Sequence, residues 1–83
     1  MQAEIDELKK QLPKRGAYNG IVKTNKQIRK KDGIQSITLS VVKNFFSGRS
    51  VSEDAQDAII ISTKRYLKAQ QEKQLKRKKL LIA

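Results

Sequence analysis

In the segment 38–48, polar and apolar side chains are spaced so that a helix would place them on opposite faces. Apolar residues occupy positions 39, 41, 42, 45 and 46; in a helix, those at 42, 45 and 46 form one stripe that 39 and 41 widen. The side chains on the opposite face are Ser40, Lys43, Asn44 and Ser47. Hydroxyl, amine and amide groups of this kind contact phosphates and base edges in a DNA groove. We therefore predict a recognition helix whose polar face points toward a duplex.

Residues at both ends of this segment predict where the helix begins and ends. Thr38 can accept a hydrogen bond from a free backbone N–H of the first turn, and Gly48 can adopt the left-handed conformation that closes a helix. These signals place the helix at 39–47. The adjacent Phe45 and Phe46 could stack on the bases of a single strand. Their helical spacing beside other apolar residues favours the core for at least one of them.

Other helices must hold this one in place, and apolar spacing predicts where they lie. Apolar residues at i, i+3 and i+7 indicate a helix at 2–12, which Pro13 ends. A second is expected at 17–31, where Gly20 costs about 1 kcal/mol relative to alanine and a break near Thr24–Asn25 would divide the helix. The inner stripe of this second helix consists of Tyr18, Ile21, Val22, Asn25 and Ile28.

A turn and a long helix complete the predicted elements. Asp32–Gly33 is a strong turn signal, and the residues 34–38 that follow it are expected to be extended. Ser52 is a good N-cap for a helix from 53 to about 79, whose first turn is acidic, as the helix dipole favours. One face of this helix is marked by Ala55, Ala58, Ile59, Ser62 and Tyr66.

Three apolar residues of the long helix are left over from that face: Ile60, Ile61 and Leu67. They provide more apolar surface than one small core requires, and an exposed isoleucine patch usually marks an interface. We therefore predict a homodimer through residues 53–67.

Basic residues crowd the end of the same helix. Between positions 64 and 79 the chain carries eight lysines and arginines against one acid, Glu72. This cluster is either a frayed, solvated helix end or a surface that contacts phosphates flanking a DNA site. We accordingly divide the chain into a DNA-binding domain at 1–63 and a basic helical extension at 64–83.

The charge of the whole chain favours a polyanionic partner. Its 83 residues include 19 Lys and Arg against 8 Asp and Glu, which gives a net charge of +11. A bias this strong in one small domain favours nucleic acid, although an anionic membrane surface or an acidic protein would also fit the charge alone.

The composition argues against several other classes of protein. The chain has no cysteine or histidine, so thiolate ligands, imidazole ligands and the commonest acid–base catalyst are missing. Its acids are dispersed, and it has no glycine-rich phosphate cradle. We expect no metal, no cofactor, no small-molecule substrate and no enzymatic activity. The sequence also has no membrane-length apolar run and no signal peptide pattern, which predicts a cytoplasmic location.

From Leu12 to Ala58 the sequence resembles a small helix-turn-helix family common in Bacteroidetes and their phages. The residues that carry the resemblance are Leu12-Pro13-Lys14-Arg15-Gly16-Ala17-Tyr18, Thr38, Val42-Lys43-Asn44-Phe45-Phe46-Ser47-Gly48-Arg49 and Ser52-Glu53-Asp54-Ala55. The second half also resembles the headpiece of lactose-repressor-type regulators, in which such a helix enters the major groove. The resemblance implies an all-α helix-turn-helix bundle, here with a long basic C-terminal helix, and transcriptional regulation on the nucleoid of a bacterial or phage-infected cell.

One segment departs from the family pattern. Residues 32–37 are longer than the turn of three or four residues in a compact helix-turn-helix. A wing-like loop that touches the DNA backbone, or a small hairpin, is expected there.

Together these features predict a sequence-specific protein that binds double-stranded DNA as a transcriptional regulator. The residues expected at base edges or nearby phosphates are Ser36, Thr38, Ser40, Lys43 and Asn44. Those expected on the DNA backbone, with the basic tail, are Lys14, Arg15, Lys31 and Arg49. The alternative is a non-specific architectural or packaging protein, including one carried in a phage particle. A third class is a basic amphipathic module at 53–82 that binds a membrane or another protein.

Overall fold

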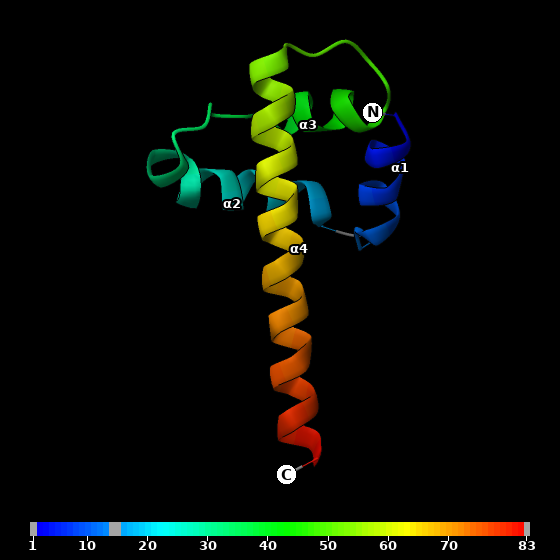
Figure 1. Cartoon of the computed structure of the whole chain (residues 1–83), viewed down its shortest axis with the longest axis vertical. Helices are drawn as coiled ribbons and strands as arrows, with labels where there is room; N and C mark the ends of the chain where they lie inside the picture. The colour runs from blue at the N-terminus through cyan, green and yellow to red at the C-terminus, as the bar shows by residue number, and fades with distance from the viewer. Residues whose placement is uncertain (1, 14–15, 83) are drawn as a thin grey trace.

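Four helices make up the fold, and the computed structural model describes residues 2–13 and 16–82 of the chain. In chain order the helices are α1 (Gln2–Gln11), α2 (Ala17–Asp32), α3 (Leu39–Phe46) and α4 (Glu53–Ile82). The described residues contain no strand, so the expected all-α class with a long C-terminal helix is confirmed. Figure 1 shows α4 running the length of a molecule of 47 × 28 × 20 Å, with α1, α2 and α3 gathered around its first half.

Local capping explains most of the helix ends. The Thr38 hydroxyl accepts a hydrogen bond from the Val41 N–H at 3.3 Å, and the Ser52 hydroxyl accepts one from Ala55 at 3.4 Å. Gly33 and Gly48 follow α2 and α3 with φ of 65° and 82°, a left-handed conformation that glycine adopts without steric cost. α3 ends at Phe46, one residue before the predicted end, and α4 continues to Ile82 rather than stopping near 79.

The structure decides between alternatives that the sequence leaves open at two places in the middle of the chain. α2 runs without a break through Thr24–Asn25, and the Thr24 hydroxyl donates to the Gly20 carbonyl at 2.8 Å within the helix. Residues 34–38 form an irregular loop rather than a hairpin. This loop is anchored by side chains of α2 instead of by a partner strand, as described below.

Gly20 lies in the middle of α2 because α4 comes very close at that point. A Cβ atom on Gly20 would overlap Cε2 of Tyr66 and would lie 2.9 Å from its Cζ. The absence of a side chain therefore lets the Tyr66 ring pack directly on the α2 backbone. The propensity cost expected from the sequence is offset by this close helix–helix contact.

The core lies where α2, α3 and α4 meet. Ile21, Val42 and Ile59 come from these three helices and are fully buried, and each such side chain contributes about 1.5–3 kcal/mol. Phe45 and Phe46 are both buried, which excludes them from stacking on bases. The Phe46 ring stacks on Tyr18 at 5.4 Å between centroids and packs edge-on against Phe45 at 5.1 Å.

The apolar residues predicted to be left over on α4 are mostly accounted for by this core. Leu67 is buried at 8% exposure, and Ile60 is half-buried against the core cluster. Ile61 alone of the three is exposed, at 37%. The premise of a broad free isoleucine patch is therefore wrong. Other parts of the chain cover α4 beyond the one apolar face that its sequence marks most clearly. After Leu67, positions 68–81 of α4 are exposed except for the half-buried Gln70.

Candidate nucleic-acid interface

α3 buries its central apolar stripe, leaves Leu39 and Val41 half-buried at its edges, and exposes most of its polar residues. Val42, Phe45 and Phe46 face the core, with exposed fractions of 4% or less. The residues on the outer surface are Ser40, Lys43 and Ser47, with Asn44 half-buried beside them. Because α3 contains no acidic residue, the outer surface offers hydroxyl, amine and amide groups without a competing negative charge.

A fully buried amide on α2 holds the loop that leads into α3. The Asn25 Nδ2 donates to the Gln35 carbonyl at 2.9 Å and to the Ser62 hydroxyl at 3.3 Å. Its Oδ1 accepts from the Ile37 N–H at 3.2 Å. One side chain thus joins α2, the loop and α4, and it fixes the backbone directly before the N-cap of α3.

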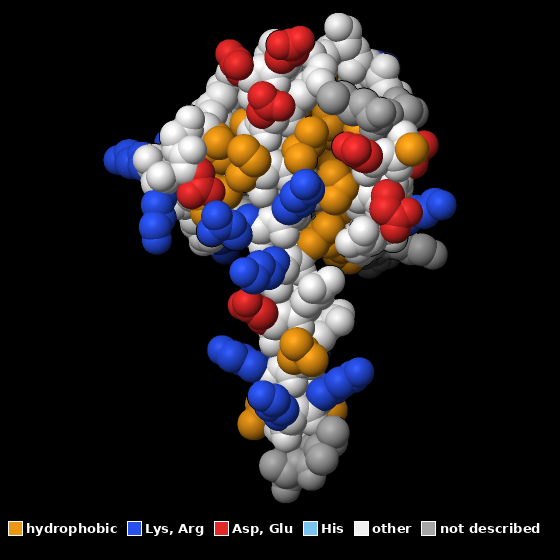
Figure 2. All heavy atoms as spheres, in the orientation of Figure 1, with side chains coloured by type: hydrophobic (Ala, Val, Ile, Leu, Met, Phe, Trp, Pro, Cys, Tyr) orange, Lys and Arg blue, Asp and Glu red, His pale blue; other side chains and the backbone are white. Residues whose placement is uncertain are grey.

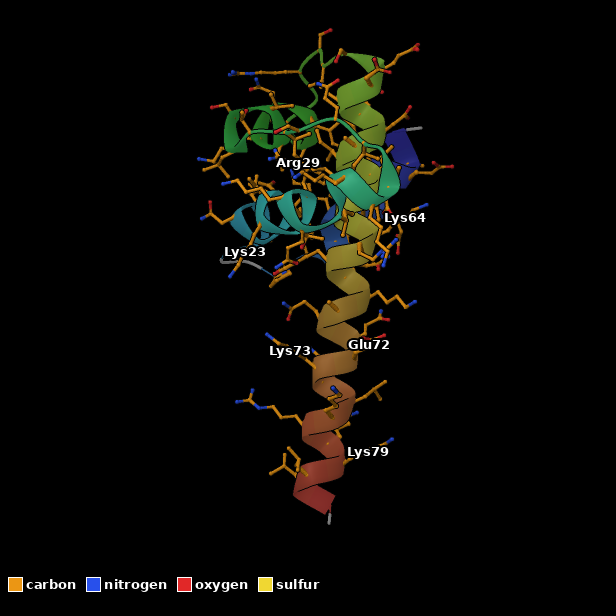
Figure 3. All side chains as sticks on the ribbon, turned by 90° about the vertical axis from the view of Figure 1, so that its left-hand side faces the viewer. Lys23, Arg29, Lys64, Glu72, Lys73 and Lys79 are labelled. Carbon is orange, nitrogen blue, oxygen red and sulfur yellow. The ribbon has the colours of Figure 1, made fainter. Side chains whose placement is uncertain are left out.

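A second contact from α2 reaches the same loop nearer to solvent. The Arg29 guanidinium of α2 donates to the Ser36 hydroxyl of the loop at 2.9 Å, and Figure 3 shows where Arg29 lies. Ser36 and Thr38 are themselves exposed. Each hydroxyl already accepts one hydrogen bond within the protein, so each keeps its O–H as a donor toward a phosphate oxygen.

Lys43 opens onto a hollow of about 420 Å³ between the end of α1, the start of α2 and α3. Its lining includes a second cation, Lys9, together with Asn19 and Leu39. The Lys9 ammonium donates to the Phe46 carbonyl at 3.4 Å, at the C-terminal end of α3 where the helix dipole favours a cation. The hollow therefore places two positive groups next to the outer face of α3.

The predicted site residues are brought together only in part. Ser36, Thr38, Ser40, Lys43 and Asn44 all lie on α3 or on the loop that enters it. Arg49 is exposed just beyond α3, where its N–H donates to the Asn44 carbonyl at 2.9 Å. Lys31 is exposed on the last turn of α2, outside the α3 surface. Lys14 and Arg15 lie outside the described residues.

Sequence reasoning missed the positioning role of two α2 residues. Asn25 was assigned to the inner stripe of its helix, and Arg29 to none of the predicted contacts. The available signal was an amide in the middle of an apolar stripe, because buried polar groups are nearly always hydrogen-bonded. Its partners lie 10 to 37 positions away in sequence, so local spacing does not identify them.

Charge is segregated along α4. Figure 2 shows acidic side chains where the helix begins and basic ones further down, and Glu53 and Asp54 form the acidic first turn. At the junction, Arg65 on α4 pairs with Asp32 at the end of α2 at 3.0 Å. The acidic end of the molecule is thus separate from the basic half of α4.

No group of three or more potential metal ligands occurs within 2–13 and 16–82. No helix in that part of the chain is long and apolar enough to span a membrane. Comparisons with protein families, with curated proteins and with solved structures found no significant match for this chain. The helix-turn-helix resemblance therefore stays a prediction from the sequence.

Proposed function

We propose that this protein binds double-stranded DNA by placing α3 in the major groove and acts as a sequence-specific regulator. The observation that carries the proposal is the two-sidedness of α3. Val42, Phe45 and Phe46 are buried on one side. Ser40 and Lys43 on the other side, with Ser47 at the C-cap, are exposed without any acid among them. A helix held from behind by its apolar side leaves its polar side for a groove wide enough to admit it.

The exposed side chains fit distinct roles at such an interface. Lys43 would donate to guanine O6 or N7, and Asn44 would pair with the N6 and N7 edge of adenine. Ser40 and Thr38 suit base edges or phosphates, and Ser36 and Arg49 suit phosphates at either end of α3. Lys31, with Lys14 and Arg15, would add contacts to the DNA backbone.

The test begins with selection of a preferred site from a random duplex library. The variant Lys43→Ala/Asn44→Ala should then lose at least about thirtyfold in affinity for the enriched site, because each base contact contributes about 1–3 kcal/mol. The matched control Lys10→Ala/Gln11→Ala removes one exposed amine and one exposed amide from α1 and should keep the site preference. A folded Lys43→Ala/Asn44→Ala variant with unchanged motif and affinity would refute the role of α3.

The alternative function is non-specific binding as an architectural or packaging protein. It is favoured by the exposed basic half of α4, which carries charge well away from α3. The ratio of affinities for the selected site and random duplex separates the two, since a regulator should prefer its site by about a thousandfold or more. We expect the protein on the nucleoid of a bacterial or phage-infected cell, where cross-linking to chromosomal or phage DNA would test its location.

A homodimer through residues 53–67 is proposed on a smaller surface than the sequence indicated. Ile61 shares a hollow of about 470 Å³ with Ile34, and Asp54 and Asp57 also line it. A symmetric pair of half-sites in the selected DNA, and sedimentation as a dimer on that DNA, would support the proposal. A monomer at micromolar concentration, both free and on DNA, would contradict it.

A further inference from the structure

The core-facing side of α4 continues into its exposed C-terminal half. Within the bundle this side carries Ile59, Ser62 and the half-buried Tyr66. At about 100° per residue, the same direction is reached again at Gln70, Lys73 and Arg77, all within about 45° of a common line. The helix thus presents first an apolar side and then a basic one toward the region occupied by α2 and α3.

Figure 3 shows the direction of one of these side chains, Lys73. Lys73 points to the side of α4 on which α3 and Lys23 of α2 lie, whereas Glu72 and Lys79 point to the other side. We call the line of Gln70, Lys73 and Arg77 the tail edge. Lys23 is also exposed, so positive charge on this side of the molecule extends from α2 onto the tail edge.

Among the described residues, no other helix covers most of the side chains of α4 after Leu67. The segment 68–82 extends about 22 Å beyond Leu67, and its only half-buried side chain among positions 68–81 is Gln70. Its six cations face a single acid, Glu72. Helices of such length are marginal in water without a partner, and this charge ratio calls for an anionic one.

The three exposed leucines of the tail do not share one side of the helix. Leu75, Leu80 and Leu81 are exposed at 59%, 78% and 84%. At about 100° per residue they point in directions at least about 100° apart. A membrane-surface helix needs one apolar face, and a coiled coil needs an apolar seam; the three leucines provide neither among positions 68–81.

We propose that the tail edge is a second contact surface for the phosphate backbone of the same duplex that α3 binds. This inference rests on the proposed function and adds to it a second DNA contact on one particular side of α4. Lys73 and Arg77 lie on the side that faces the α3-bound duplex, and their cationic groups replace condensed counterions there. Cations on the opposite side of the tail, such as Lys68 and Lys79, contribute only net charge.

The experiment compares two double variants with equal changes in charge. Lys73→Gln/Arg77→Gln removes the cations of the tail edge, and Lys68→Gln/Lys79→Gln removes two that lie about 150° round the helix. Affinity for the selected duplex is measured between about 50 and 200 mM salt. The slope of log affinity against log salt concentration should be smaller by about 1.8 in the tail-edge variant than in the wild type. Over this salt range the wild-type affinity should therefore fall about twelvefold more than that of the variant. The control should change the slope by less than about 0.5.

A second measurement tests whether both surfaces touch one duplex. Hydroxyl-radical footprinting should show protected sugars flanking the α3 site in the wild-type protein and in the control. This flanking protection should disappear in Lys73→Gln/Arg77→Gln while the central protection remains. Circular dichroism of each variant checks that helix content is unchanged, as expected because all four residues are exposed.

Each other outcome has a defined meaning. The two double variants could show equal slopes of log affinity against log salt while Lys43→Ala/Asn44→Ala still loses affinity for the selected site. This result would overturn the tail edge as a DNA contact and leave the role of α3 intact. Weakened DNA binding in the tail-edge variant with no effect of Lys43→Ala/Asn44→Ala would overturn the role of α3, and with it the tail edge as a second surface on an α3-bound duplex. Loss of binding to vesicles of anionic lipid in the tail-edge variant, with an unchanged DNA slope, would overturn the inference in favour of a lipid surface.

Discussion

Replacing Asn25 by aspartate should destabilise the protein strongly and in a way that depends on pH. The amide makes all three of its hydrogen bonds inside the protein, two as a donor through Nδ2 and one as an acceptor through Oδ1. Asn25→Asp keeps the shape and the acceptor, but it places an acceptor where the donor was. The Gln35 carbonyl, 2.9 Å from Nδ2, then faces another oxygen.

The magnitude follows from those contacts. The hydrogen bond to the Gln35 carbonyl is lost at about 1 kcal/mol, whereas the Ser62 hydroxyl can turn to donate to the new oxygen. A carboxylate without a cationic partner in a fully buried position brings the total to about 3–5 kcal/mol. Domains of this size have total stabilities of about 5–15 kcal/mol, so much of the folding free energy would disappear. The loop entering α3 would lose its main attachment to α2.

The pH dependence has a definite sign. Burial raises the pKa of the introduced carboxyl group above its value of about 3.9 in the unfolded chain. The folded state therefore binds more protons than the unfolded state, and the stability deficit shrinks as pH falls through the raised pKa. Below that pKa the protonated carboxyl can also donate to the Gln35 carbonyl.

Denaturant unfolding at neutral pH and at pH near 5 measures both effects. Asn19→Asp is the matched control, because Asn19 is an exposed asparagine on the same helix and its replacement should change stability by less than about 0.5 kcal/mol. The reasoning is refuted if Asn25→Asp unfolds within that margin of the wild type at neutral pH. It is also refuted if the deficit relative to wild type is the same at both pH values.

Two further substitutions test the packing of α4. Gly20→Ala should destabilise the protein by about 1–3 kcal/mol despite the better helix propensity of alanine, because the new methyl group overlaps the Tyr66 ring; a thermal melt at or above the wild-type midpoint would contradict this. Thr63→Val should stabilise it by about 1 kcal/mol, since the buried Thr63 hydroxyl has no hydrogen-bond partner among the described residues. A lower midpoint for Thr63→Val would show that this hydroxyl is satisfied after all.

Features that depend on neighbouring residues can be predicted from the sequence. The Thr38 cap, the Ser52 cap, the glycine after α3 and the apolar stripe of α3 are all set within a few positions along the chain, and each is found where it was predicted. The all-α class follows from the same periodicities. The net charge of +11 is fixed by composition alone.

Tertiary structure decided the features that depend on distant partners. The burial of Leu67, the place of Gly20 under Tyr66 and the three bonds of Asn25 each require another helix or loop to arrive at a particular distance. Periodicity shows that a helix has a buried side, but not how far its neighbours wrap around it. The side of the tail that Lys73 shares with α3 is likewise set by how α4 packs against α1, α2 and α3, because these contacts fix the rotation of α4 about its axis.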